Sequence, residues 1–149
     1  MSYDNQLVNE YTELLEGCHM GASTFKIYLD ETYDMELRKL LIEAIDSFKK
    51  HEKILTEKIL HLGTDPSDDV PLMGKVSEFF EKMKVKMADT DKTLDYSLNA
   101  IDMGIKGVEK FTEKHPDLEQ EVKQAIDDLL NDYKITYQKL SDYKIRRMP

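Results

Sequence analysis

The chemistry that this chain could support centres on His51, which is predicted to face the interior of a helical bundle. An imidazole at such a position can ligate a metal ion or serve as a buried hydrogen-bonding group. Interior polar groups are usually hydrogen-bonded, and Thr90, Tyr133 and Tyr137 are the expected partners of His51. The prediction rests on a series of residues at alternating intervals of three and four, which gives a helix one buried face: Leu37, Leu41, Ala44, Phe48, His51, Leu55, Ile59 and Leu62.

A pair of metal ions inside a bundle needs a fuller ligand set than one histidine. The pattern that holds two iron ions is a Glu on each of two helices and Glu-x-x-His on each of the other two, because carboxylates must neutralise the cations. Phe48 stands where that pattern would place a Glu before His51. Glu16 and His19 spell Glu-x-x-His, but Glu16 is predicted to project toward water. With one inward histidine and no inward carboxylate, we predict no metal site.

A divergent metal centre is the alternative interpretation. His51 would then act together with acids at the edges of the buried helix faces, and the candidates are Glu52, Asp91 and Glu109. Carboxylates and imidazole suit iron and manganese. On this reading the protein would be a metal-dependent oxidoreductase or an iron-handling protein.

Cys18 is the second interior candidate for binding a cofactor or ligand. It precedes His19, but neighbouring residues of a helix point about 100° apart, so a nucleophile and its base would not meet there. Cys18 lies on an apolar face and is predicted to be a small buried hydrophobe. A third interpretation is a small apolar ligand held between the helices beside His51, Cys18, Met83 and Met87.

Four helical segments must position these side chains. The apolar periodicity predicts helices over residues 3–29, 35–62 and 75–113, and a last helix that holds Pro116 in its first turn. Residues 63–74 form the one long connection, which at about 3.3 Å per residue spans roughly 35 to 40 Å and could cross a bundle from end to end. We therefore expect an all-α four-helix bundle, one domain over residues 1–149, with a long crossover between the second and third helices.

Composition excludes several classes of function. The chain has 149 residues and a formal charge of −9, from 30 acidic and 21 basic residues, whereas nucleic-acid binding and membrane docking need basic surfaces. The single cysteine excludes an intrachain disulfide. The polar, acidic N-terminus does not resemble a secretory signal, and no apolar run is long enough to cross a membrane. We expect a cytoplasmic protein from a bacterium.

The order of these features resembles that of a known group. The first helix carries Leu14-Leu15-Glu16-Gly17, Met20-Gly21 and Phe25, the second ends in Leu62-Gly63-Thr64-Asp65-Pro66, and Leu72-Met73-Gly74 leads into the third. This order resembles small bacterial ferritin-like four-helix-bundle proteins of unassigned function. The resemblance implies a bundle whose helices run up, down, down and up. Of the di-iron ligand set found in the wider superfamily, only His51 stands at a matching position, and the last helix lacks the corresponding histidine.

We interpret the chain as a non-catalytic binding or protein-interaction module that requires no cofactor. Apolar residues that share an otherwise polar helix face favour a protein partner or a homodimer. One such line lies on the second helix and one on the third, and they consist of Met35, Ile42 and Leu60, and of Val85, Tyr96 and Met103.

Overall fold

The computed structural model describes residues 3–63 and 89–149 of the chain. These residues form four helices, which are α1 (Tyr3–Glu31), α2 (Met35–His61), α4 (Thr90–Lys114) and α5 (Gln120–Arg147). The described residues contain no strand, and short turns join α1 to α2 and α4 to α5. The predicted all-α four-helix architecture is confirmed.

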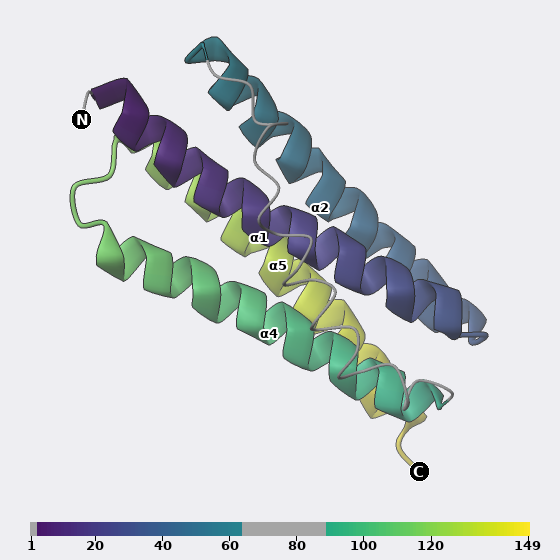
Figure 1. Cartoon of the computed structure of the whole chain (residues 1–149). Coiled ribbons are helices and arrows are strands. Elements are labelled where there is room, and N and C mark those ends of the chain that lie inside the picture. Colours follow the sequence, from purple (N-terminus) through teal and green to yellow (C-terminus); the bar gives the residue numbers. More distant parts are fainter. Residues whose placement is uncertain (1–2, 64–88) are drawn as a thin grey trace.

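The helices form a ring in which each one packs against two others. α1 packs against α2 and α4, and α5 packs against the same two helices from the other side (Figure 1). Near the C-terminal end of α5, Arg147 binds both Asp34, just before α2, and Asp91, in the first turn of α4. Because α2 and α4 begin at the same end of the bundle, they run parallel, while α1 and α5 run the opposite way. The predicted up-down-down-up order of the helices is confirmed, whereas the crossover predicted over residues 63–74 lies, except for Gly63, outside the described residues.

The buried faces of the helices are largely those that the sequence predicts. The predicted line on α2 is buried from Leu37 to Ile59, His51 included, and its last member, Leu62, is partly buried. The other three helices turn a matching apolar face inward. The largest side chains that are fully enclosed come from all four helices: Tyr11, Phe25 and Tyr28 of α1, Leu37, Leu41 and Ile59 of α2, Leu94 and Ile101 of α4, and Val122, Leu129 and Leu140 of α5.

The prediction of one continuous helix over residues 75–113 is wrong at Asp89. Asp89 has extended backbone angles (φ −110°, ψ 126°), and its carboxylate accepts a hydrogen bond of 2.9 Å from the backbone N–H of Asp91. An aspartate in this position satisfies an amide that the first turn of a helix leaves unpaired. α4 therefore starts at Thr90, and the part of the prediction over residues 75–88 lies outside the described residues.

The last helix also begins later than predicted. Pro116 lies in the turn rather than in the helix, and α5 starts at Gln120 after the extended Glu119. Leu118 is buried between them, so the chain turns inward to anchor this side chain before the helix begins. The predicted end of the second helix is close to the observed one, and Gly63 has the positive φ of 82° that favours glycine after a helix.

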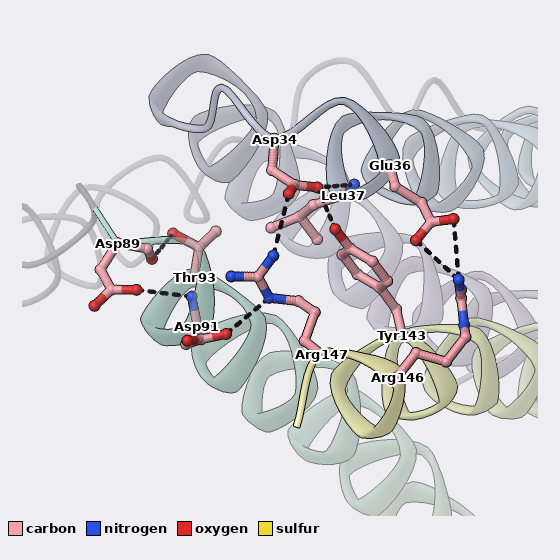
Figure 2. Close-up of polar contacts among 9 residues, drawn as sticks. All are labelled: Asp34, Glu36, Leu37, Asp89, Asp91, Thr93, Tyr143, Arg146 and Arg147. Carbon is pink, nitrogen blue, oxygen red and sulfur yellow. Dashed lines mark hydrogen bonds and ion pairs between the residues drawn. The ribbon is translucent and has the colours of Figure 1, made fainter. Parts of the chain in front are cut away.

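Polar side chains form hydrogen bonds and ion pairs between helices at the end of the bundle where α2 and α4 begin (Figure 2). Asp34 accepts hydrogen bonds from the backbone N–H of Leu37 at 2.8 Å and from the hydroxyl of Tyr143 at 2.6 Å. Partial burial opposes ionisation of Asp34, but the bonds from Tyr143 and Leu37 outweigh it and hold the pKa of Asp34 below its usual value. Arg147 lies between Asp34 (3.3 Å) and Asp91 (2.8 Å), so three helices are joined here.

Ion pairs also line the face between α2 and α5. They recur every seven residues along both helices, which is the interval at which helical side chains return to the same face. The three pairs and their N···O distances are Glu36–Arg146 at 3.1 Å, Glu43–Lys139 at 3.3 Å and Lys50–Asp132 at 2.7 Å. We call this set the α2–α5 ladder.

Candidate functional site

An apolar cavity lies between α1 and α4. It is a cavity of about 320 Å³, which is within the size range of pockets that hold small molecules. Helix α1 supplies one wall and α4 the other, and Phe48 and Tyr133 close the inner side. The lining consists of Glu13, Leu14, Gly17, Met20, Gly21, Thr24, Phe25, Phe48, Ala100, Ile101, Met103, Gly104, Gly107, Val108, Phe111 and Tyr133.

Aromatic rings from three helices form the inner wall of this cavity. The ring of Phe48 lies with its centroid 5.3 Å from that of Phe25 and 5.3 Å from that of Tyr133, and both pairs meet edge to face. Two glycines make room for the wall. A Cβ atom at Gly21 would lie 2.5 Å from Phe48, and one at Gly104 would lie 3.3 Å from Tyr133. Gly21 is therefore required by packing, whereas a methyl group at Gly104 would be tight and would require a small shift of Tyr133.

Two further glycines of the lining have no such packing role. Among the described residues, no atom lies within 4 Å of a Cβ atom added at Gly17 or at Gly107. Both residues are exposed and line the cavity, Gly17 from α1 and Gly107 from α4. A glycine inside a helix costs about 1 kcal/mol relative to alanine, and what Gly17 and Gly107 provide in return is an open mouth.

The cavity has few polar groups. Thr24 lines it and is 3% exposed. At the other end of the α1 wall, the half-exposed Glu13 lies 3.7 Å from Nε2 of His115.

Cys18 lies behind the cavity wall and is fully buried, as predicted. Its sulfur is 3.7 Å from the hydroxyl of Tyr133, and either group can be the donor. Burial raises the pKa of Cys18 to about 12 and lifts the pKa of Tyr133 well above its ordinary value. Because the thiolate is the reactive form of cysteine, this residue is chemically inert near neutral pH.

His51 is buried, but its partner is not one of the three predicted residues. Its Nε2 atom lies 2.6 Å from the carboxylate of Asp132 on α5, and Lys50 lies 2.7 Å from the same oxygen. Burial opposes ionisation of Asp132, yet Lys50 and His51 keep its pKa below the usual value. The ionised carboxylate only accepts hydrogen bonds, so the proton of this contact is on Nε2 of His51.

The position of the predicted partners explains why they do not bind His51. Tyr133 turns toward Cys18 instead, and Tyr137 is 40% exposed. Asp132 reaches His51 because α2 and α5 are antiparallel and lie at the same level here, so a residue at the edge of the buried face of one helix contacts the other helix. The seven-residue spacing of opposite charges on the two helices is the sequence signal that could have revealed this contact.

The prediction that no carboxylate turns inward is also wrong, because Glu10 is only 3% exposed. Glu10 accepts a hydrogen bond of 3.3 Å from Gln6 and lies 3.9 Å from His115, where the turn between α4 and α5 covers the end of α1. Its position between the buried Leu7 and Leu14 was the available signal.

The structure does not bring the four residues of the alternative metal site together. Glu52 lies 3.5 Å from His19 on α1, while Asp91 binds Arg147 at the end of the bundle where α2 and α4 begin. Glu109 is an exposed residue of α4. Within the part of the chain that the structure describes, no three His, Cys, Asp or Glu side chains converge to hold a metal ion. Met83 and Met87, predicted beside an apolar ligand, lie outside the described residues.

The predicted exposed apolar lines are partly present. Met35, Ile42 and Leu60 are all exposed on α2, and Met103 is exposed on α4, but Tyr96 packs partly against the core and Val85 lies outside the described residues. A homodimer or protein partner stays a prediction. None of the described helices is apolar over a stretch sufficient to cross a membrane, and the cytoplasmic location also stays a prediction.

Comparison with known proteins supports the fold and leaves the activity open. A family model described as a domain of unknown function (DUF2383) matches residues 6–114. Comparison with curated proteins gives no match. A crystal structure of a two-domain protein from Anabaena variabilis, with DJ-1/ThiJ/PfpI-like and ferritin-like domains, superposes with a TM-score of 0.78 at 18% identity. The match covers 98% of this chain and 38% of that one. The bundle is therefore ferritin-like.

Proposed function

The chain belongs to the DUF2383 family, a domain of unknown function, and from this premise we propose that its ferritin-like bundle is a binding module for a small apolar molecule. The observation that carries the proposal is the cavity of about 320 Å³ between α1 and α4. At about 30 Å³ for each water-sized group, this volume accommodates on the order of ten heavy atoms. A ligand of that size would touch aromatic rings on its inner side and α1 and α4 on its flanks.

The glycines of the cavity support a binding role over a packing defect. Gly21 and Gly104 give the aromatic wall room, whereas Gly17 and Gly107 leave the mouth open without any contact to a described residue that requires them. Alanine at these two positions would make both helices more stable, by about 1 kcal/mol each. A ligand entrance would explain why glycine stands at these two positions despite the helix stability that it costs.

The chemistry of the lining favours binding over catalysis. The charged side chain that borders the cavity is Glu13, which is half-exposed and already faces His115. The nearby Cys18 is inert because of its raised pKa, and Tyr133 is likewise held in its neutral form. Among the described lining residues, no nucleophile lies beside a base of the kind with which an enzyme attacks a substrate.

The metal-dependent oxidoreductase that was the alternative receives no support from this geometry. His51 is committed to Asp132, and the three acids proposed with it lie in separate places. The further residues needed for a pair of ions are not provided near His51 by the described parts of the chain.

A titration with N-phenyl-1-naphthylamine tests the proposal, because this neutral apolar dye fluoresces strongly only in apolar surroundings. The wild-type protein should bind it saturably at one site. Gly17→Leu places a side chain in the open mouth and should weaken binding at least tenfold, while leaving the unfolding free energy unchanged or higher. Lys53→Leu, which adds the same side chain to an exposed position of α2, serves as the control. Absence of saturable binding, or equal binding by the Gly17→Leu variant, would refute the proposal.

A further inference from the structure

The outward face of α2 carries a row of charged side chains. They follow one another at alternating intervals of four and three residues, so at about 100° per residue they fall within an arc of about 80°. This arc lies opposite the buried line of α2, and all of its members are exposed. The row, which we call the α2 charge row, consists of Lys39, Glu43, Asp46, Lys50, Lys53 and Glu57.

The bundle itself leaves most of the α2 charge row without an ionic partner. Glu43 lies 3.3 Å from Lys139 of α5 and keeps 43% of its side chain exposed. Lys50 lies 2.7 Å from Asp132 and keeps 57% exposed. Among the described residues, the other four members take part in no ion pair, and no two members pair with each other even where opposite charges stand four residues apart. Contacts within the chain therefore do not account for the row.

The order of charges in the row is complementary to its own reverse. From the N-terminal end the signs are plus, minus, minus, plus, plus and minus, and reading backwards gives the opposite sign at every position. The spacing is the same in both directions. When α2 of a second copy lies antiparallel to the first, every member of the row therefore meets an opposite charge. The three kinds of pair, each formed twice across a two-fold axis, are Lys39 with Glu57, Glu43 with Lys53, and Asp46 with Lys50.

Other arrangements of two α2 helices bring like charges together. In a parallel pair each member of the row meets its own copy. An antiparallel pair displaced by seven residues opposes Lys39 to Lys50 in one direction and Asp46 to Glu57 in the other. Complementary charge determines the orientation of an association more than its strength, and here it favours one orientation.

Apolar side chains beside the row can supply the attraction. Met35, Ile42 and Leu60 of α2 are 78%, 44% and 51% exposed. In the antiparallel pair, Met35 of each copy comes to the level of Leu60 of the other, because the two residues stand at almost equal distances from the middle of the row. Burial of such side chains is favourable, whereas exposed ion pairs contribute little each.

We propose that two copies of this chain associate through α2, with the helices antiparallel and the two α2 charge rows facing each other. The closed two-fold arrangement uses the same surface on both copies. The mouth of the cavity lies between α1 and α4 and takes no part in this contact. The inference is therefore independent of the proposed binding function.

Charge reversal tests the pairing of Lys39 with Glu57, neither of which has an ion pair in the bundle. Lys39→Glu and Glu57→Lys each place like charges opposite one another at two symmetry-related positions. Each should raise the dissociation constant of the dimer at least about fivefold in sedimentation equilibrium. An equimolar mixture of the two variants should restore association, because one chain then has acids at both positions and the other has bases. Lys110→Glu and Glu113→Lys, which make the same changes at exposed positions of α4, are the matched controls.

Cross-linking measures the orientation. Lys39→Cys mixed with Glu57→Cys should be joined by a short bismaleimide, while Lys39→Cys alone should not be, because residue 39 and its own copy lie about 27 Å apart in the antiparallel pair. Cys18 is buried and does not compete.

Three results would overturn the proposal. The first is a wild type that is monomeric at every concentration. The second is a dimer that the reversals on α2 weaken no more than the reversals on α4 do, or that the mixture fails to restore. The third is efficient cross-linking of Lys39→Cys to itself, which would indicate parallel helices.

Discussion

The same substitution one turn apart on α1 should have opposite effects on stability. Gly17→Ala adds a methyl group where no atom of residues 3–63 and 89–149 lies within 4 Å, so the gain in helix propensity of about 1 kcal/mol should appear in full. Gly21→Ala makes the same gain, but its Cβ atom would lie 2.5 Å from Cε1 of Phe48. Carbon atoms in contact are normally about 3.5 to 4.0 Å apart, so the ring must move by about 1 Å.

That movement is costly because the ring of Phe48 is held on both sides. Its edge-to-face contacts with Phe25 and Tyr133 fix its orientation, and added volume in a packed core costs about 1 to 3 kcal/mol. After the propensity gain is deducted, Gly21→Ala should destabilise the protein by up to about 2 kcal/mol. The two variants should therefore differ by roughly 1 to 3 kcal/mol in unfolding free energy.

Urea unfolding followed by circular dichroism measures this difference, provided that the slope of the transition is the same for both variants. Phe48→Leu supplies the control, because the smaller side chain removes the clash and should make Gly21→Ala stabilising in that background. If Gly21→Ala stabilises the wild type as much as Gly17→Ala does, the ring of Phe48 moves freely. The aromatic wall would then not define the cavity as we describe it.

The remaining predictions concern the polar contacts. Asp34→Ala removes a helix cap and the acceptor of the Tyr143 hydroxyl and should cost about 2 to 3 kcal/mol in urea unfolding, whereas Asp34→Asn, which keeps the cap, should cost less than half as much. Asp132→Ala should cost about 1 to 3 kcal/mol because it leaves His51 buried without this partner, and a loss below 0.5 kcal/mol, on the order of a surface substitution, would show that the contact is dispensable. The folded-state pKa values of Asp34 and Asp132 are lowered. Their contribution to stability is therefore present above the ordinary carboxyl pKa and is lost as the pH falls below about 4. Unfolding midpoints measured from pH 7 to pH 2 should fall less steeply in an Asp34→Asn/Asp132→Asn variant than in the wild type. Cys18 should resist a thiol reagent at pH 8 until urea unfolds the chain, and rapid labelling of the native protein would contradict its burial and its raised pKa.

The sequence predicts the helices well because their buried faces repeat over many turns. A line such as that of α2 contains eight regularly spaced positions, so one uncertain residue does not alter the result. The helix ends were predicted less well. Asp89 and Glu119 begin helices through local backbone geometry, and a continuous apolar pattern extends across such a boundary without marking it.

The candidate site was less predictable because it depends on relations between helices. The inward position of His51 follows from its own helix, but its bond to Asp132 depends on the level at which α5 lies against α2. In the same way, no pattern within α1 distinguishes Gly17 from Gly21. Only the position of Phe48 on a second helix shows that one glycine is required by packing and that the other leaves space.

The α2–α5 ladder has a consequence for the alignment of these two helices. Its first two pairs have the acid on α2 and the base on α5, and its third has them exchanged. If α5 slid by two turns in one direction, Glu43 would face Asp132, and a slide in the other direction would oppose Lys50 to Lys139. Each of these shifts also leaves one attractive pair, Glu36 with Lys139 or Glu43 with Arg146. Exposed pairs of this kind add little to stability, but the native alignment is the only one of the three in which every pair attracts.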